Sequence, residues 1–309
     1  MKLSPLSVLL GIVAHLSVTI TADDSPGLIV GGAKIGARHY VVALLKNANP
    51  VDPANFVCGG SLIAPDLVLT AAHCLNGLDP LTLVARFNVD DLSQPDFVNG
   101  LQDGDTVEVT NFQKDVVGDY AVLLLSRISP KAKAVVLNAY PGNPSDTMPG
   151  YWSDLNVKGW GYTAVGGPLS FTALKEVNVT YLNNADCAAK LGGPIGVTDL
   201  CAGNLAGGNQ VCDGDDGDPL ICICTDPHMC LHHLPEDPPI QVGVVKSFVP
   251  CALPNKPDVY VRVSAVLDGI KTMACALKAA PGCDAANLAA IGVTTTETHG
   301  VACCGELIL

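Results

Sequence analysis

Short apolar runs separated by turn residues recur along this chain in two successive groups, and this texture constrains the fold more than any single motif. The runs are rich in Val, Leu, Ile and Ala, and 31 glycines and 22 prolines supply turn signals along the chain. Such runs predict short β-strands, and a proline- and glycine-rich stretch at 140–150 divides them. A helix is expected at 263–279, with Ser264 as its N-cap. Two groups of strands closed by a helix predict an all-β fold of two packed β-barrels.

The two ends of the chain differ from this strand-rich part. Lys2, an apolar stretch at 6–20 and the small residue Ala22 predict a signal peptide at 1–22, whose apolar core is shorter than the roughly 20 residues of a membrane-spanning helix. Residues 23–28 form a short polar leader, and residues 281–309, rich in Ala, Thr and Gly, form a C-terminal extension. We therefore expect a secreted, extracellular protein with no membrane anchor.

Cysteine content indicates the compartment of the protein, and its charge limits the kinds of partner it can bind. Thirteen cysteines indicate an oxidising compartment. Asn178-Val179-Thr180 is a glycosylation sequon, which a secreted chain can use. The formal net charge of −13 argues against binding to nucleic acid or to acidic membranes and is compatible with a basic protein partner.

Four short motifs follow one another in a fixed order between residues 29 and 280. They read Ile29-Val30-Gly31-Gly32, Thr70-Ala71-Ala72-His73-Cys74, Gly118-Asp119-Tyr120-Ala121-Val122-Leu123 and Gly214-Asp215-Asp216-Gly217-Asp218-Pro219. In this order they resemble the chymotrypsin-like (trypsin-type) serine protease family. The resemblance covers residues 29–280 as one homology domain and implies two packed six-stranded Greek-key β-barrels with a C-terminal helix.

The resemblance also implies the positions of a catalytic triad, in which a histidine takes a proton from a serine and a buried carboxylate orients the histidine. His73 corresponds to the base, Asp119 to the orienting carboxylate, and Asp216 to the nucleophile, where the family carries a serine. The segment Gly214, Asp215 and Asp216 corresponds to the loop whose N–H groups stabilise the oxyanion. Acylation of an aspartate would give an anhydride, and its charge would repel the oxyanion. We therefore expect a site that no longer hydrolyses peptides.

The residue after Gly214 has a second implied role. Asp215 corresponds to the acid that captures the freed N-terminus in the family, which makes Ile29 its implied partner. Leu28 stands before Ile29, where the family usually carries a basic residue, so a trypsin-like activator would not cut there.

Further departures fall on the implied specificity pocket and the nucleophile loop. Gln210 corresponds to the pocket floor, Lys246 and Phe248 to its wall, and Asp258 to a position that is usually small. Phe248 and Asp258 are expected to narrow the pocket. Asp218 replaces a glycine of the nucleophile loop and is expected to distort it, because glycine permits backbone conformations and close approaches that other residues do not.

The family pattern implies three disulfides, Cys58–Cys74, Cys187–Cys201 and Cys212–Cys251. Seven cysteines remain, an odd number that leaves one thiol free or joined to another chain. They are Cys222, Cys224, Cys230, Cys275, Cys283, Cys303 and Cys304.

Two clusters contain groups that bind metals. Asp213, Asp215, Asp216 and Asp218 offer oxygen ligands, but their spacing does not match a calcium loop, and a decayed catalytic loop is the favoured interpretation. Zinc would accept the cysteines and histidines of residues 222–233, but a disulfide-closed surface loop is favoured in a secreted chain. We predict no metal and no cofactor.

These observations predict a secreted, catalytically inactive serine protease homologue that acts by binding an extracellular protein. Inactive secreted members of the family include the glucanase inhibitor proteins of plant-pathogenic oomycetes, which bind plant endoglucanases. The resemblance thus implies a hydrolase such as an endoglucanase as one partner. The alternatives are an active or residually active serine-type endopeptidase and a metal-binding or structural extracellular protein.

Overall fold

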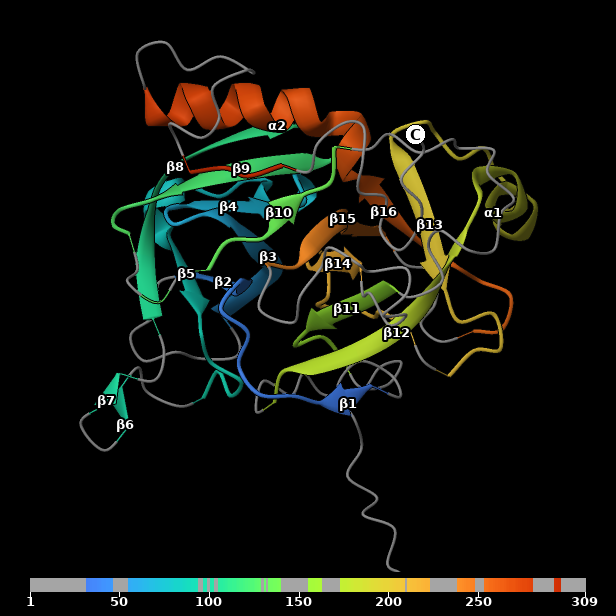
Figure 1. The fold of residues 1–309 in the computed structure, drawn as a ribbon, viewed down its shortest axis with the longest axis horizontal. Coiled ribbons are helices and arrows are strands. Elements are labelled where there is room, and N and C mark those ends of the chain that lie inside the picture. The colour runs from blue at the N-terminus through green and yellow to red at the C-terminus, as the bar shows by residue number, and fades with distance from the viewer. Residues whose placement is uncertain are drawn as a thin grey trace, which may run out of the picture.

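The computed structural model describes residues 32–46, 55–93, 97–98, 101–102, 105–128, 131, 133–139, 155–162, 173–208, 210–222, 238–247, 253–279 and 292–295. The predicted signal peptide, the leader, Ile29 and most of the C-terminal extension lie outside these residues. Two β-barrels lie side by side, and the long helix α2 crosses the first barrel (Figure 1).

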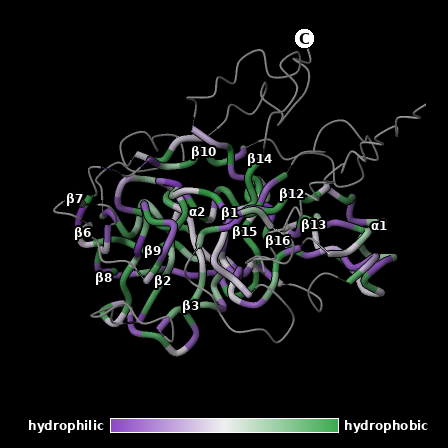
Figure 2. Tube along the Cα trace, turned by 90° about the horizontal axis from the view of Figure 1, so that it is seen from below, coloured by the Kyte–Doolittle hydropathy of each residue, from purple (hydrophilic) through white to green (hydrophobic). Residues whose placement is uncertain are grey.

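The first barrel closes in the order β2-β3-β4-β9-β8-β5, with every neighbouring pair antiparallel. Its strands are β2 (Val41–Lys46), β3 (Phe56–Ala64), β4 (Leu67–Thr70), β5 (Leu83–Phe87), β8 (Asp105–Asp115) and β9 (Tyr120–Leu125). Along the first half of β8 buried and less buried residues alternate, because successive side chains of a strand point to opposite faces. Figure 2 shows hydrophobic and hydrophilic residues interspersed along the chain.

The second barrel contains β11 (Leu155–Gly159), β12 (Lys175–Leu182), β13 (Asp199–Gly203), β14 (Pro219–Cys222), β15 (Ile240–Ser247) and β16 (Asp258–Arg262). Pairing of β12 with β13 closes the ring. Two short strands add to its edges, β1 (Ala33–Lys34) beside β12 and β10 (Val136–Leu137) beside β15. A separate hairpin joins β6 (Phe97–Val98) to β7 (Leu101–Gln102). The predicted fold, two six-stranded barrels followed by a helix, is confirmed.

The helices differ from the prediction in two details. Helix α2 (Val263–Lys278) packs on β8 and β9, but its N-cap is Arg262 with no side-chain capping bond, so the prediction of Ser264 was wrong. Strand β16 ends at Arg262 and the helix follows at once, which places Ser264 inside the first turn. The short helix α1 (Asn184–Leu191) was not predicted, although Asn183 caps it and Gly192 ends it with a left-handed φ of 75°. Within the described part of the chain, no helix is long and apolar enough to span a membrane.

Contacts between the barrels fix the position of the site. The fully buried Trp160 donates from Nε1 to the carbonyl of Asp90, at 3.0 Å. Ser61 of β3 donates to the side chain of Gln241 on β15, at 2.7 Å, in a buried contact. These two hydrogen bonds join the first barrel to the second.

Candidate functional site

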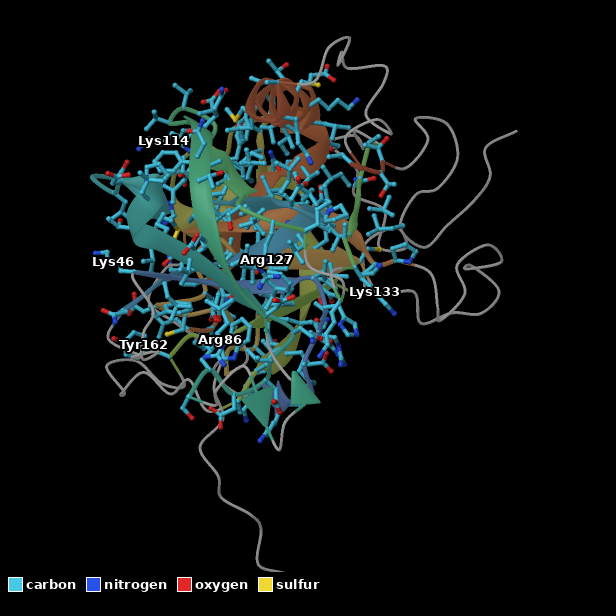
Figure 3. All side chains as sticks on the ribbon, turned by 90° about the vertical axis from the view of Figure 1, so that its left-hand side faces the viewer. Lys46, Arg86, Lys114, Arg127, Lys133 and Tyr162 are labelled. Carbon is cyan, nitrogen blue, oxygen red and sulfur yellow. A yellow bond between two sulfur atoms is a disulfide. The ribbon has the colours of Figure 1, made fainter. Side chains whose placement is uncertain are left out.

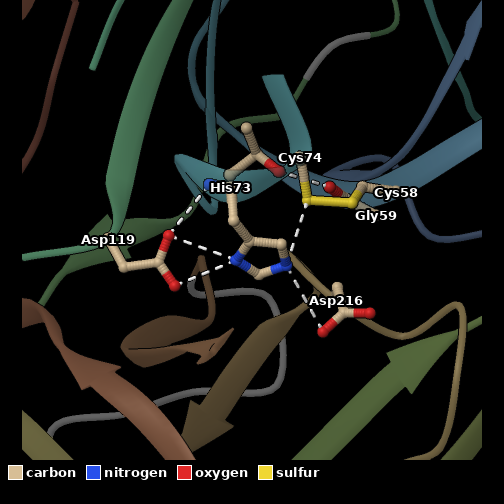
Figure 4. The surroundings of a disulfide bond; sticks show 7 residues. Cys58, Gly59, His73, Cys74, Asp119 and Asp216 are labelled. Atoms are coloured by element: carbon tan, nitrogen blue, oxygen red, sulfur yellow. Dashed lines mark hydrogen bonds and ion pairs between the residues drawn. A yellow bond between two sulfur atoms is a disulfide. The ribbon is translucent and has the colours of Figure 1, made fainter. Parts of the chain in front are cut away.

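His73 opens a short 3₁₀ turn, His73–Leu75, which follows β4 of the first barrel. The next residue, Cys74, forms the predicted disulfide with Cys58 of β3. The Sγ atom of Cys74 lies 3.9 Å from Nε2 of His73. The disulfide thus anchors the turn that carries the imidazole (Figure 4).

Asp119 holds one side of the His73 ring. Its Oδ2 and Oδ1 atoms lie 2.9 and 3.1 Å from Nδ1, and Oδ1 also accepts from the backbone N–H of His73 at 2.9 Å. Asp119 has a left-handed φ of 60°, which is uncommon for a non-glycine residue. In the turn before it, Asp115 accepts from the N–H groups of Val117 and Gly118. The turn between β8 and β9 is thus shaped to aim this carboxylate at the histidine.

Asp216 approaches the other side of the ring from the second barrel. Its Oδ1 lies 3.5 Å from Nε2 of His73 (Figure 4). Its backbone carbonyl accepts from the N–H of Gly59 at 2.8 Å. The structure therefore brings together His73, Asp119 and Asp216, the three positions assigned to the triad.

The two carboxylates determine the charge of the imidazole. Hydrogen bonding to Asp119, and then to Asp216, raises the pKa of His73 to about 10, although partial burial opposes the shift. At neutral pH the ring is therefore an imidazolium, with one N–H directed to each carboxylate. A general base must be unprotonated to accept a proton, so this ring cannot activate a nucleophile in that state.

The backbone of the nucleophile loop is left-handed at two glycines. Gly214 and Gly217 have φ of 88° and 83°, and Asp218 has no positive φ. Position 218 therefore does not require the backbone freedom of glycine, and the distortion of the loop by Asp218 stays a prediction. Its side chain needs space rather than backbone freedom, and two glycines provide that space. A Cβ on Gly59 would lie 1.8 Å from Oδ1 of Asp218, and a Cβ on Gly159 would lie 1.8 Å from Oδ2. Glycine inside a strand is the sequence signal that could have indicated this close approach.

The positions assigned to the pocket have different surroundings. Gln210 is buried and donates to the carbonyl of Lys256 at 2.5 Å. Asp258 is buried as well and accepts from the N–H of Val211, and burial, together with the charge of Asp215, raises its pKa well above the usual range. Lys246 forms an ion pair with Asp199 at 2.9 Å. Phe248 lies outside the described residues.

The other predicted covalent features are present in part. Cys187 and Cys201 form a disulfide. Cys212 is disulfide-bonded, and its predicted partner Cys251 lies outside the described residues. Cys222 and Cys275, two of the seven unassigned cysteines, are disulfide-bonded as well, so neither supplies a free thiol.

The Asn178 sequon is accessible, because Asn178 is exposed on β12. Its Oδ1 accepts a hydrogen bond from Asn156 at 2.9 Å. For metals, the ligand atoms of Cys58, His73 and Cys74 lie within 4.8 Å of one another, but the two sulfurs are bonded to each other and are not thiolates. The cysteine and histidine cluster considered for zinc, after Cys222, lies outside the described residues.

Comparison with known proteins gives two results. A protein-family model described as Trypsin matches residues 29–270. Glucanase inhibitor protein 3 of Phytophthora infestans is 33% identical over 268 residues, which cover 83% of this chain and 93% of that protein.

Proposed function

Because this chain belongs to the trypsin family, we propose that it is a secreted binding protein without peptidase activity and that its partner is an extracellular hydrolase such as an endoglucanase. The observation that carries the proposal is the carboxylate of Asp216, 3.5 Å from Nε2 of His73. A serine at this place would be a neutral nucleophile activated by a neutral histidine. Asp216 instead pairs with a histidine that stays charged at neutral pH.

Two kinds of support indicate a protein as the ligand. The first is the similarity to a protein whose name states that it inhibits glucanases, at 33% identity over most of both chains. The second is charge: the sequence carries a net −13, which favours a basic partner. Figure 3 labels five basic side chains, which are spread apart rather than aligned in one stripe: Lys46, Arg86, Lys114, Arg127 and Lys133.

The turn that leads to Asp119 exposes two apolar side chains. Val116 and Val117 are 67% and 93% exposed. Apolar side chains of this kind form the core of a protein–protein contact when a partner buries them. We assign the partner to this turn together with the His73–Asp216 edge of the cleft.

A glucanase inhibition assay tests the proposal. The purified secreted chain is added to a panel of plant endo-β-glucanases, and the rates of glucan hydrolysis are measured alongside binding. We expect at least one enzyme to be bound and slowed, and no hydrolysis of casein or labelling by a fluorophosphonate probe. Val117→Asp should abolish inhibition, whereas Val197→Asp should not, because Val197 is 73% exposed but lies between α1 and β13. Fluorophosphonate labelling, or no binding to any enzyme of the panel, would contradict the proposal.

A further inference from the structure

Asp218 is a buried acid that has no salt-bridge partner among the described residues. It is fully buried, and neither carboxylate oxygen reaches a described group at standard hydrogen-bond geometry. The carboxyl group of Asp215 lies beside it, and the two share one glycine. A Cβ on Gly159 would lie 1.8 Å from Oδ2 of Asp218 and 2.7 Å from Oδ1 of Asp215. An ionised carboxylate without a partner is too costly to bury, so this pair must hold at least one proton.

Asp215 is the acceptor that organises the loop. Its Oδ1 accepts from the N–H of Gly161 at 2.9 Å, and its Oδ2 accepts from the N–H of Cys212 at 2.8 Å. Both donors favour the ionised form of Asp215. The proton of the pair therefore resides on Asp218, whose carboxylic acid lies beside the carboxyl group of Asp215 and is influenced by it.

We propose that Asp218 is a positioning residue that takes the place of a freed N-terminus at Ile29: its protonated carboxyl holds Asp215, and with it the 212–218 loop, in the chain that is uncut after Leu28. In this arrangement the loop is built without zymogen cleavage. Leu28 removes the usual activation cut, and Asp218 then makes that cut unnecessary.

The backbone of the loop is connected to both barrels through this segment. Asp218 donates from its N–H to the carbonyl of Asp215 at 3.0 Å and accepts from the N–H of Val245, on β15, at 2.9 Å. Gly59 of β3 donates to the carbonyl of Asp216 at 2.8 Å. An ordered Asp218 thus fixes the position of Asp216 relative to His73.

Among the described residues, the charged groups on the packed elements leave the pair without a cation. Lys158 of β11 lies 3.6 Å from Glu176, and Lys246 of β15 pairs with Asp199. The negative charge of Asp216 raises the pKa of both Asp215 and Asp218, and the charge of Asp215 also raises that of Asp218. The charge of Asp215 acts on the buried Asp258 as well. Burial, and then the charges of Asp215 and Asp216, raise the pKa of Asp218 well above its usual range, and burial raises that of Asp215 to about 7.

These raised pKa values fix the direction of the pH dependence. Because the folded loop binds protons more tightly than the unfolded chain does, its stability is complete below the ordinary pKa of 3.8 and falls as pH rises through about 7. Asp218→Asn keeps a donor at every pH and removes one titrating group, so it should flatten this decline. Asp218→Gly removes the donor altogether.

Hydrogen exchange of the Gly161 and Cys212 amides, which donate to Asp215, tests the proposal on the full secreted chain with its leader intact. We expect Asp218→Gly to lower the protection of both amides at least 10-fold, and Asp218→Asn to keep it within about 3-fold of wild type. A second form of each chain carries a specific protease site in place of 23–28, so that cleavage exposes Ile29. Exposure should leave wild type unchanged and restore protection in Asp218→Gly.

The readout is amide exchange rather than binding or activity, so it is independent of the identity of the partner. Equal protection in uncut wild type and uncut Asp218→Gly would overturn the proposal. A rise of 10-fold or more in wild-type protection when Ile29 is exposed would also overturn it. If Asp218→Gly does not fold, the wild-type comparison and the pH profile of Asp218→Asn decide the matter, and an Asp218→Asn profile as steep as wild type would contradict the proposal.

Discussion

The two barrels contribute unequally to the cleft. The first barrel supplies His73 and Asp119 in an arrangement that would serve a protease, with Nδ1 held at 2.9 Å and a disulfide anchoring the turn. The second barrel supplies the 212–218 loop, in which acids occupy the nucleophile position and its interior. The frame that orients the histidine and the loop that would carry the nucleophile thus come from different barrels. Under the proposed function, the chain keeps the frame, and the loop no longer supports peptide hydrolysis.

The largest expected effect comes from repairing the second-barrel half. Asp216→Ser alone restores the hydroxyl but leaves the buried acids Asp218 and Asp258. We expect the triple variant Asp216→Ser, Asp218→Gly, Asp258→Gly to exceed the single variant by at least about 100-fold in kcat/KM, because Asp258 occupies a usually small position of the implied specificity pocket and a substrate misplaced by 1 Å loses about that factor. Both are assayed on a panel of peptides with Ile29 exposed. Equal rates would show that Asp216 is the only difference that matters.

Removal of one disulfide from each barrel compares how much the two bonds contribute to the free energy of unfolding. Cys58–Cys74 and Cys187–Cys201 span 16 and 14 residues, so loop-closure entropy predicts nearly equal contributions of about 3 kcal/mol each. Cys58 and Cys74, or Cys187 and Cys201, are replaced in pairs by alanine, and unfolding in urea is measured. A loss in the first barrel larger by more than about 1 kcal/mol would show that the His73 turn depends on its disulfide for more than chain entropy.

The smallest expected effect is a change in the pKa of His73. Its titration shows which of the two carboxylates, Asp119 or Asp216, raises this pKa more. Asp119→Asn should lower the pKa of His73 further than Asp216→Asn does, because the Asp119 hydrogen bond is the larger cause of its rise to about 10. Since the folded-state pKa is raised, the stability from these pairs is complete below about 6.5 and is lost as pH rises through about 10. NMR titration of the imidazole measures both shifts. A larger drop in Asp216→Asn would reverse the assigned roles.

The sequence predicted the features that ordered motifs determine. The two groups of short apolar runs predicted the two barrels. The order of the motifs, through the family resemblance, predicted that Asp216 lies opposite His73. It did not predict how Asp218 is accommodated, because the space comes from Gly59 and Gly159 on two distant strands whose approach only the packed barrels define. The Lys246–Asp199 pair depends in the same way on contacts between elements far apart in sequence. Ser264 was chosen as N-cap from local preference alone, and the direct passage of β16 into α2 overrode it.

Under the proposed function, the site at His73 and Asp216 binds a protein partner and does not cleave it. The most direct test of this claim is the affinity of an inhibited endoglucanase for wild type and for two charge reversals, measured by calorimetry at fixed salt. Asp216→Lys should weaken binding at least 10-fold, about 1.4 kcal/mol, because it inverts the charge beside His73. Asp268→Lys, at a side chain 92% exposed on α2, should change it less than 2-fold. Equal affinity of wild type and Asp216→Lys, or cleavage of the glucanase by wild type, would contradict the claim.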